Sequence, residues 1–439
     1  MRSVGVLMGG TVFAQAITVL VLPLLTRLYR PEDFSILAVY AAVLAIISVV
    51  ACLRLEIAIP LPGLDEDAAN LLALALLSSA GSGLVTAMVV MLWPAWITEC
   101  LKQPDLRSHL WLLPLGVWLT SSYAAIQFWV TRKKGFAMLA KTRVTQSALG
   151  TGTQLGMGWL AFGPIGLLLG QLLNSGAGAF RLGYKVWQAD KNIFYTIHWA
   201  GMRRLLKEYE KFPRYSVWEA LANNAGIQLP MLIIAALVVG PEAGYLFLAT
   251  RIMASPISLI GGAVAQVYLS HAPEAYKAKD LGSFTVKILG GLMRTGVGPL
   301  LFIGIVAPLA FPVIFGSNWH RAGELVAWMT PWFIMQLLSS PVSMSLHVTG
   351  NQSVAFLLQM FGFILRVAVT GLAVWSGKWI SEAYAISGFV FYFVYNYVIL
   401  KTVGSQKAEV IRTLGSSLVP AGLWVGGGLI SSLLLLLAK

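Results

Sequence analysis

The sequence predicts an all-α polytopic membrane protein, and three observations lead to this fold class. Of the 439 residues, 57% are hydrophobic and 11% are charged, whereas about a quarter of the residues in a soluble protein are charged. The hydrophobic residues form runs of about twenty, which is the length of helix that crosses a bilayer. A Pro-Glu turn joins two such runs at positions 31–32 and again at 241–242. This spacing, close to half of the chain, predicts two lobes that each begin with such a hairpin, and an even number of helices in each would relate them by a pseudo-twofold axis along the membrane normal.

Six apolar runs form the predicted first lobe, residues 1–187. Each run ends at a turn that contains proline, glycine or charged residues. The runs cover about 4–25, 34–53, 71–93, 110–130, 145–162 and 165–186. A basic segment at 188–214 follows them, and we expect it to be the cytoplasmic linker between the lobes.

The predicted second lobe, residues 215–400, opens with the hairpin of two apolar runs that turns at Pro241-Glu242. The other four spans are a proline-rich run and three runs near 324–346, 353–375 and 383–400. Residues 401–439 add a basic segment and an apolar run, 417–438, that has no charged residue. A true span is favoured for this last run because of its length, and a flat or re-entrant helix is the alternative.

Lysine and arginine are distributed unevenly between alternate loops. With the amino terminus in the cytoplasm, the predicted cytoplasmic segments hold 21 of these residues and the opposite loops hold six. This bias sets the orientation, so the net charge of +13 indicates membrane topology rather than binding of nucleic acid. The two cysteines and five histidines have no spacing typical of a disulfide framework or a metal site. We therefore expect no metal and no cofactor.

Two arginines interrupt apolar runs of the predicted second lobe. Arg251 lies about two turns into the eighth span, and Arg366 lies in the middle of the eleventh. A charged side chain in a membrane helix costs at least ~2.5 kcal/mol, so each should face protein, water or a charged ligand. We predict that both bind an anionic substrate in a cavity. The alternative is an ion pair with a carboxylate on another helix.

Two further arginines, Arg54 and Arg294, lie near the cytoplasmic ends of predicted spans. They are candidates for the same cavity, although a side chain at such a position ordinarily extends to the membrane surface. Glu56 follows Arg54 by two residues, which would place the two side chains on different faces of a helix. We therefore expect that they do not neutralise each other.

Amides and one carboxylate supply the remaining candidates. Asn224 and Gln228 are four residues apart on one helix face and could bind sugar hydroxyls. Glu219 and Asn223 have the same spacing and could bind a coupling proton or sodium ion, although an ordinary interhelical hydrogen bond is the favoured interpretation. Besides Arg54, the polar wall of the first lobe is expected to contain Gln15, Gln127 and Gln154.

Four stretches of the sequence resemble one transporter family. They are GGTVFAQAITVLVLPLLTRLYRPEDF, LRLEIAIPLP, KTRVTQSALGTGTQLGMGW with the following GPIGLLLGQLL, and the segment from Phe212 to Ala272. These stretches are similar to the Wzx-type oligosaccharide flippases. That family is in the polysaccharide-transport branch of the multidrug/oligosaccharidyl-lipid/polysaccharide (MOP) exporter superfamily. Together the stretches cover roughly half of the chain.

The resemblance implies two six-helix lobes around a cavity that opens to one side of the membrane at a time. It implies a substrate of an oligosaccharide on undecaprenyl diphosphate or a similar carrier, moved from the cytoplasmic to the periplasmic leaflet of the bacterial inner membrane. The product would serve assembly of O-antigen, capsule or exopolysaccharide, and so lipopolysaccharide biosynthesis in the first case. The expected partners are this lipid-linked substrate and membrane lipids, with a glycan polymerase and chain-length proteins as candidates.

Two other functions stay open at this point. A cation-coupled drug or metabolite exporter of the same superfamily would share the fold, but it would be expected to carry acidic residues in its cavity. A membrane glycan polymerase or ligase would be an enzyme, and no nucleophile–base pair or carboxylate cluster is visible in the sequence. Arginines within the spans, and few carboxylates there, favour a transporter of an anionic substrate.

Overall fold

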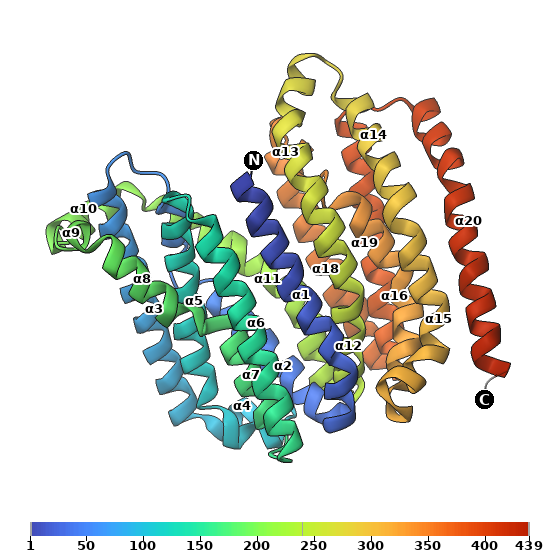
Figure 1. The fold of residues 1–439 in the computed structure, drawn as a ribbon, viewed down its shortest axis with the longest axis horizontal. Helices are drawn as coiled ribbons and strands as arrows, with labels where there is room; N and C mark the ends of the chain where they lie inside the picture. The colour runs from blue at the N-terminus through green and yellow to red at the C-terminus, as the bar shows by residue number, and fades with distance from the viewer. Residues whose placement is uncertain (1, 239, 438–439) are drawn as a thin grey trace. The chain divides into compact units, whose positions relative to one another are not determined.

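The computed structural model describes residues 2–238 and 240–437, and these residues form α-helices joined by short turns, with no strand among them. The chain divides into two compact units, Met1–Gly244 and Tyr245–Lys439. The ribbon in Figure 1 shows the course of the helices within each unit. The all-α fold class predicted from the sequence is confirmed.

The first unit contains the helices from α1 to α11. Their bounds are α1 (Arg2–Leu28), α2 (Pro31–Ser48), α3 (Asp65–Leu92), α4 (Pro94–Leu101), α5 (Leu112–Arg132), α6 (Phe136–Trp159), α7 (Ile165–Gly176), α8 (Gly178–Ala189), α9 (Lys191–Phe194), α10 (Trp199–Glu208) and α11 (Val217–Leu237). α1 packs along α6, α6 packs on α7, and α3 packs on α5. Close approach depends on small residues, because a Cβ atom on Gly150 would lie 2.7 Å from the carbonyl oxygen of Gly170. Membrane helices commonly associate in this way.

Both predicted Pro-Glu turns lead into a helix. At the first, which begins α2, the Asp33 carboxylate accepts a hydrogen bond of 2.9 Å from the Arg30 N–H. Proline and acidic residues both suit the first turn of a helix. The second turn leads into α12 (Glu242–Pro256), where the Gly244 N–H donates to Ser35 Oγ at 2.9 Å. The last residue of the first unit is therefore hydrogen-bonded to the start of α2.

The second unit holds most of α12 and the helices that follow it. Their bounds are α13 (Gly262–Lys277), α14 (Leu281–Leu292), α15 (Gly298–Phe315), α16 (His320–Ser339), α17 (Ser345–Val348), α18 (Gln352–Ser376), α19 (Ile380–Thr402) and α20 (Lys407–Leu437). Two π-helical turns, Ile257–Gly261 and Met293–Val297, connect α12 to α13 and α14 to α15. Prolines lie close to both turns, at Pro256 and Pro299, and proline disturbs the regular helical hydrogen bonds. α16 packs against α15 and α19, and α19 packs against α18.

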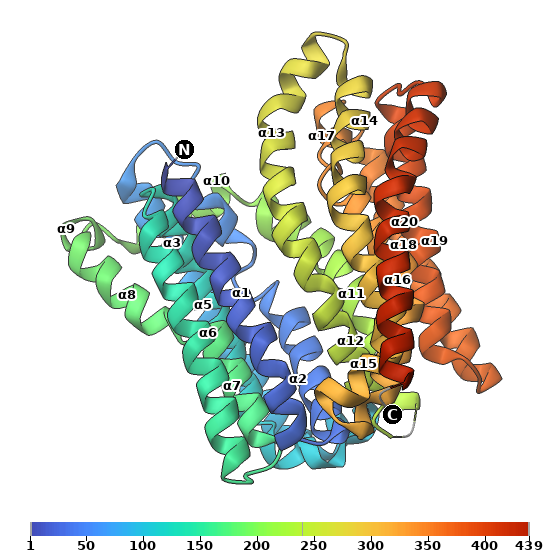
Figure 2. The same ribbon diagram turned by 45° about the vertical axis from the view of Figure 1, so that its right-hand side comes forward.

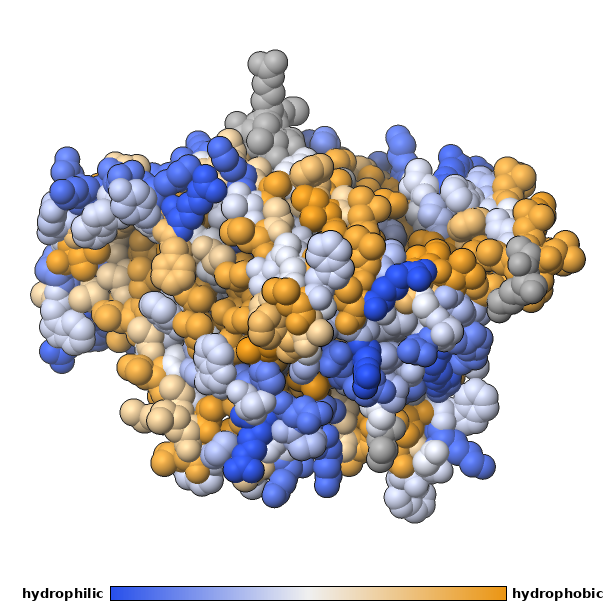
Figure 3. Space-filling model, turned by 60° about the horizontal axis from the view of Figure 1, so that its bottom comes forward, coloured by the Kyte–Doolittle hydropathy of each residue, from blue (hydrophilic) through white to orange (hydrophobic). Residues whose placement is uncertain are grey.

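Nine helical segments of the described residues are long and apolar enough to cross a membrane. They are Gly9–Leu28, Pro31–Ser48, Asp65–Leu92, Phe212–Leu237, Glu242–Gly261, Leu281–Phe315, Gln352–Ser376, Ile380–Thr402 and Lys407–Leu437. Large apolar side chains on these segments are exposed, such as Leu20 (76%), Met91 (81%) and Leu423 (75%). Figure 3 shows broad hydrophobic areas on the visible surface. Such exposure suits lipid rather than water, so the chain is a multi-pass membrane protein. The other predicted runs coincide with α5, α6, α7 with α8, and α16, and they remain predicted spans.

The predicted inter-lobe linker, residues 188–214, is largely helical and lies within the first unit. α10 contacts α3, and Arg204 makes an ion pair with Asp67 of that helix. The Asn70 side chain accepts a hydrogen bond of 3.1 Å from the His198 N–H. α11, which the sequence analysis assigned to the second lobe, packs on α2 and belongs to the first compact unit. The lobe boundaries that we inferred from the order of the apolar runs, 1–187 and 215–400, remain a prediction.

The last apolar run forms α20, a continuous helix of 31 residues. It lies beside α15, as both ribbon views show (Figures 1 and 2). Ser432 Oγ donates to the Ile305 carbonyl at 3.3 Å, and the rings of Trp424 and Phe302 have centroids 5.9 Å apart. The additional C-terminal helix is therefore confirmed. Residue 438, the last of the predicted run, and residue 439 lie outside the described residues.

Candidate functional site

Arg366 lies in the second unit within a group of aromatic rings. Gly362, one turn earlier on α18, leaves room for the ring of Phe391 on α19. The guanidinium carbon, Cζ, lies 4.6 Å from the ring centroid of Phe391, 5.5 Å from that of Tyr392 and 5.7 Å from that of Trp332. These distances are typical of cation–π contacts. The faces of these rings stabilise the positive charge, but they supply no hydrogen-bond acceptor for Nε or Nη2.

Two nitrogens of Arg366, Nε and Nη2, are buried and have no hydrogen-bond acceptor among the described residues. Together they form the side edge of the guanidinium, which can bind a carboxylate or phosphate through two parallel hydrogen bonds. The whole residue is 5% exposed. The Thr370 hydroxyl, one turn further on, and the Trp332 indole nitrogen also lack partners in the described part of the chain. Buried polar groups are normally hydrogen-bonded, so this group of donors is suited to a ligand or to water.

Arg321 of the same unit has the opposite surroundings. Its guanidinium is paired with Glu324 at 3.0 Å and with Glu382 at 2.6 Å. Glu382 is 3% exposed, and the arginine balances its buried charge. The sequence analysis did not predict these pairs. The Glu382 carboxylate lies on α19, and only the packing of α16 on α19 brings it to Arg321.

Arg251 lies on α12 and is half-buried. Its Cζ lies 5.8 Å from the ring centroid of Phe247. Within the described second unit, carboxylates form ion pairs with Arg321 and His320, and not with Arg251 or Arg366. We refer to Arg251 and Arg366 as the uncompensated arginines. The alternative of a carboxylate partner, which the sequence left open, finds no support within this unit.

The expectation that Arg54 and Glu56 lie on different helix faces is wrong. Leu53 and Arg54 have φ angles of 53° and 60°, so the regular helix has ended and a short 3₁₀-helix, Leu55–Ala58, follows. In this turn Arg54 Nη1 lies 3.3 Å from Glu56 Oε1, and the two side chains form an ion pair. Positive φ values are uncommon outside glycine. No residue type at these positions signals them in the sequence.

Three other predicted site residues make contacts that join neighbouring helices. Asn224 Nδ2 donates to the Ala45 carbonyl at 2.9 Å and joins α11 to α2. Gln154 Nε2 donates to the Leu167 carbonyl at 3.2 Å and joins α6 to α7. Arg294 is exposed and donates to a serine hydroxyl of α20 at 2.9 Å. A role for these three residues in substrate binding stays a prediction.

The remaining predicted residues lie on three helices of the first unit. Gln15, Gln127 and Gln228 are half-buried on α1, α5 and α11. Glu219 and Asn223 are exposed, whereas a bound sodium ion would be surrounded by several oxygen ligands. No group of three histidine, cysteine, aspartate or glutamate residues suited to a metal ion occurs in the described part of the molecule. The roles proposed for these five side chains also stay predictions.

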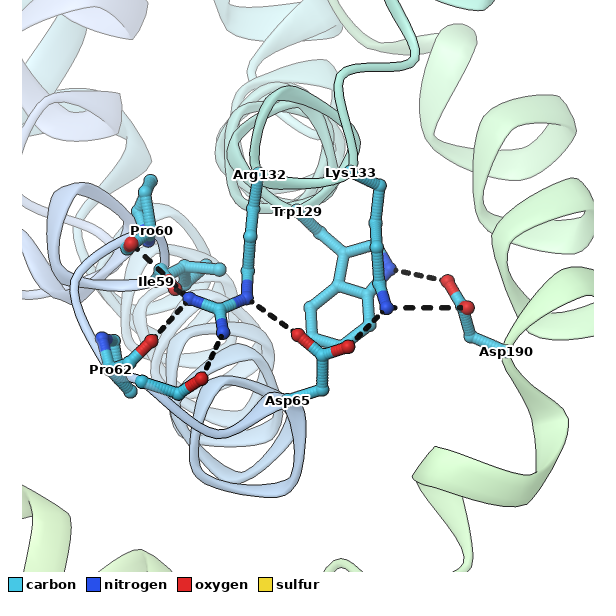
Figure 4. Close-up of polar contacts among 9 residues, drawn as sticks. Ile59, Pro60, Pro62, Asp65, Trp129, Arg132, Lys133 and Asp190 are labelled. Carbon is cyan, nitrogen blue, oxygen red and sulfur yellow. Dashed lines mark hydrogen bonds and ion pairs between the residues drawn. The ribbon is translucent and has the colours of Figure 1, made fainter.

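A charged cluster that the sequence analysis did not predict lies in the first unit (Figure 4). Asp65, at the start of α3, accepts hydrogen bonds from Arg132 Nε at 2.9 Å and from Lys133 Nζ at 2.5 Å. Lys133 also lies 3.7 Å from Asp190, which accepts a hydrogen bond of 2.9 Å from the Trp129 indole. We call these five residues the Asp65 cluster. It contains two positive and two negative side chains.

Arg132 also fixes the loop that precedes α3. Its Nη1 donates to the carbonyl oxygens of Pro60 at 3.2 Å and Pro62 at 2.6 Å. Figure 4 shows these carbonyls and Asp65 converging on the one guanidinium. The cluster therefore holds α3, α5 and the segment after α8 together. The acidic start of α3 and the basic end of α5 are visible in the sequence, but their pairing depends on the fold.

Comparisons with known proteins agree with this architecture. Residues 24–324 match the family described as polysaccharide biosynthesis protein. Among solved structures, the chain is similar to the lipid II flippase MurJ in an inward closed conformation. The sequence identity is 11% and the TM-score is 0.78, with 98% of this chain and 97% of that chain covered.

Two other solved structures share the fold at a lower level of similarity. One is a multidrug resistance MATE family transporter of the MOP superfamily in an inward-facing conformation, with 16% identity, a TM-score of 0.60, and 90% and 94% of the two chains covered. The other is a MOP superfamily transporter from Pyrococcus furiosus, with 15% identity, a TM-score of 0.56, and 92% and 97% covered. The curated proteins gave no match. Because the family match covers more than half of the chain, the chain belongs to the polysaccharide biosynthesis protein family, and its fold is that of MurJ and the MOP superfamily transporters.

Proposed function

We propose that this protein is a Wzx-type flippase that moves a polyprenyl-diphosphate-linked oligosaccharide from the cytoplasmic to the periplasmic leaflet by alternating access. Membership of a polysaccharide biosynthesis family supports a glycan substrate. Similarity of fold to a protein named lipid II flippase supports a lipid-linked one. The product would serve assembly of a surface polysaccharide, and the protein's place would be the bacterial inner membrane.

The observation that carries the proposal is the pair of uncompensated arginines. A cation within a membrane helix costs at least ~2.5 kcal/mol, and the same unit neutralises Arg321 with two carboxylates. A diphosphate would supply the missing negative charge, and its oxygens suit the unoccupied side edge of Arg366. Because a diphosphate cannot cross ~30 Å of hydrocarbon unaided, fixed cations on its path would lower the barrier while the lipid tail stays in the bilayer.

A drug exporter of the same superfamily is the second candidate. The Pyrococcus furiosus transporter is described as having a binding pocket of reverse polarity that suggests a different function for that protein. The sign of the interior charges is thus a useful guide to substrate charge. A cationic drug would need an unpaired carboxylate, whereas the buried Glu56 and Glu382 are each paired with an arginine. This pairing favours the anionic substrate.

A reconstituted transport assay tests the proposal. The purified protein is placed in liposomes that carry a fluorescent polyprenyl-diphosphate disaccharide, and transbilayer movement is followed with a membrane-impermeant quencher. We expect movement with the wild type and with Arg107→Ala, an exposed control, and little movement with Arg366→Gln. Movement of a cationic dye in place of the disaccharide lipid would favour the exporter and contradict the flippase.

The proposed orientation has its own test. Cys100 is exposed on α4, in the loop that the charge bias places in the periplasm, whereas Cys52 is buried. A membrane-impermeant maleimide should label Cys100 in intact cells. In a Cys100→Ser background, Ser405→Cys should be labelled after the membrane is opened and not before. The reverse pattern would overturn the orientation and the direction of transport.

A further inference from the structure

Glu56 is a buried carboxylate that the substrate contacts proposed above do not use. It lies in the 3₁₀-helix Leu55–Ala58 and is 5% exposed. Its Oε1 is paired with Arg54 at 3.3 Å, but its Oε2 has no hydrogen-bond partner among the described residues. Arg54 Nε is also buried without a partner in this part of the chain. Each member of the pair therefore has one buried polar atom without a hydrogen-bond partner among the described residues. Buried polar atoms are normally hydrogen-bonded, so a further ligand is expected here.

The turn that carries the pair is held from two sides. The Ala51 carbonyl accepts hydrogen bonds from the hydroxyls of Ser78 at 2.9 Å and Ser82 at 3.0 Å on α3. The Cys52 thiol donates to the Ser121 carbonyl of α5 at 3.3 Å. These contacts fix the backbone just before Arg54. The geometry of the ion pair is thus set by the fold rather than by chance contact of two flexible side chains.

Arg54 is the charged residue that acts on Glu56. The 3₁₀-helix packs against α3, α5 and the π-helical turn Phe212–Ser216. The titratable and charged groups on these elements and on the preceding turn are Cys52, Asp65, Glu66, Asp67, Tyr123, Arg132, Arg214 and Tyr215. Asp65 and Arg132 are bound to each other, and Arg214 is exposed beside Tyr215. Burial raises the pKa of the Glu56 carboxyl and outweighs the opposing effects of a backbone hydrogen bond and of Arg54.

We propose that Glu56 binds and releases the proton that is coupled to substrate transport, with Arg54 as its charged partner. The inference rests on the proposed flippase function. A proton from water adds to Oε2 and converts the carboxylate into a neutral carboxylic acid, and the same proton returns to water when the acid dissociates. A proton needs no space and no further ligands, whereas a sodium ion would need several oxygen atoms, and Oε2 has none beside it among the described residues.

The pairing with Arg54 gives the proton a means to control the substrate. When Glu56 is ionised, its charge holds Arg54. When Glu56 is protonated, Arg54 is released to bind the diphosphate, for which it was a predicted ligand. By thermodynamic linkage, substrate binding must then favour proton uptake to the same extent that protonation favours substrate binding. In this cycle the Arg54 guanidinium pairs with the Glu56 carboxylate at one stage and with the substrate diphosphate at another.

Infrared difference spectroscopy of the purified protein in nanodiscs tests the proton site without any substrate. We expect a carboxylic acid C=O band that disappears as the pH is raised above the ordinary range for glutamate, about 4.3. The band should be absent from Glu56→Gln, should titrate at a different pH in Glu56→Asp, and should be unchanged in Glu99→Gln, an exposed control of the same unit. Persistence of the band in Glu56→Gln would overturn the proposal.

Transport in liposomes tests the coupling. An imposed pH gradient should accelerate movement of the disaccharide lipid by the wild type and by Glu99→Gln. Glu56→Gln, which imitates the protonated state, should bind the lipid at every pH and lose the response to the gradient. A response retained in Glu56→Gln would contradict the coupling role. If the wild type moves no disaccharide lipid but the Glu56 band still titrates, the flippase proposal fails and the proton site stands.

Discussion

The Asp65 cluster and the surroundings of Arg366 differ in how their charges are balanced. In the Asp65 cluster, Arg132 and Lys133 face Asp65 and Asp190, and the Trp129 indole completes the hydrogen bonding. Around Arg366 the neighbours are aromatic rings, and no carboxylate of the described second unit is paired with it. The first arrangement holds helices together and leaves no charge to attract a ligand. The second leaves a buried positive charge on Arg366, and another group must supply the negative charge that neutralises it.

This difference separates structural arginines from those that we propose to bind substrate better than burial does. Arg132 has a side chain that is 12% exposed, and Arg366 is 5% exposed. Both are therefore largely removed from solvent. Their acceptors distinguish them, because Arg132 binds a carboxylate and several carbonyl groups while two nitrogens of Arg366 have no acceptor among the described residues. The same test places Arg321 with Arg132.

Replacement of Arg366 by glutamine should have the largest effect on transport. The change removes the charge and the bidentate edge while it keeps much of the side-chain volume. A hydrogen bond to a charged group contributes ~1.5–3 kcal/mol, so the loss should lower the transport rate about 10- to 100-fold. Liposome transport and protein abundance in the membrane are measured together. A large fall in abundance with unchanged specific transport would assign Arg366 to the structural group.

Replacement of Arg251 should have a smaller, graded effect. Its half-buried side chain contacts the ring of Phe247 and is partly exposed. The ring and the surroundings would therefore stabilise the charge together with the substrate. Lysine keeps a cation but loses the planar fork that suits phosphate oxygens, and alanine loses both. Transport should decrease in the order arginine, lysine, alanine, by about tenfold for alanine if one charge-assisted hydrogen bond is lost. Equal transport by all three proteins would show that residues other than Arg251 bind the charged group of the substrate.

Arg132→Ala should lower stability and leave the transport rate per folded molecule nearly unchanged. The substitution removes the hydrogen bonds to the carbonyl groups of Pro60 and Pro62 and one partner of Asp65. Because the Asp65 side chain is 42% exposed, its ion pair is screened by solvent. The expected loss is about 2 kcal/mol. Thermal unfolding in detergent measures it, with exposed Arg107→Ala as the matched control.

The contrast also shows what the sequence could and could not predict. The helical fold, the Pro-Glu turns and the final helix follow from hydropathy and turn residues, which act over short distances along the chain. Arg251 and Arg366 are visible as charges within apolar runs. The absence of a carboxylate partner within their unit was not visible, because ion pairs such as Arg321 with Glu382 join residues far apart in the chain.

The Arg54–Glu56 pair was predicted wrongly for a local reason. The spacing rule assumed a regular helix, but α2 ends at Ser48, and the left-handed residues Leu53 and Arg54 turn the chain just before Glu56. Neither leucine nor arginine favours such a conformation. The packing of α3 and α5 on this turn stabilises it. Long-range packing thus decides a conformation that local propensity would not select.

Trp129→Phe should have the smallest effect and gives the sharpest test of the contrast. In the wild type the ring centroids of Trp129 and Phe194 are 5.2 Å apart. The substitution keeps an aromatic ring against Phe194 and removes only the N–H that donates to Asp190. Lys133 still balances the Asp190 charge at 3.7 Å, so the loss of stability should be about 1 kcal/mol. Trp159→Phe, at a position that is 86% exposed, is the control. If the Asp65 cluster is structural, Trp129→Phe lowers the unfolding temperature by a few degrees and leaves the transport rate unchanged. A loss of transport as large as that of Arg366→Gln would show that the balanced cluster also acts on the substrate.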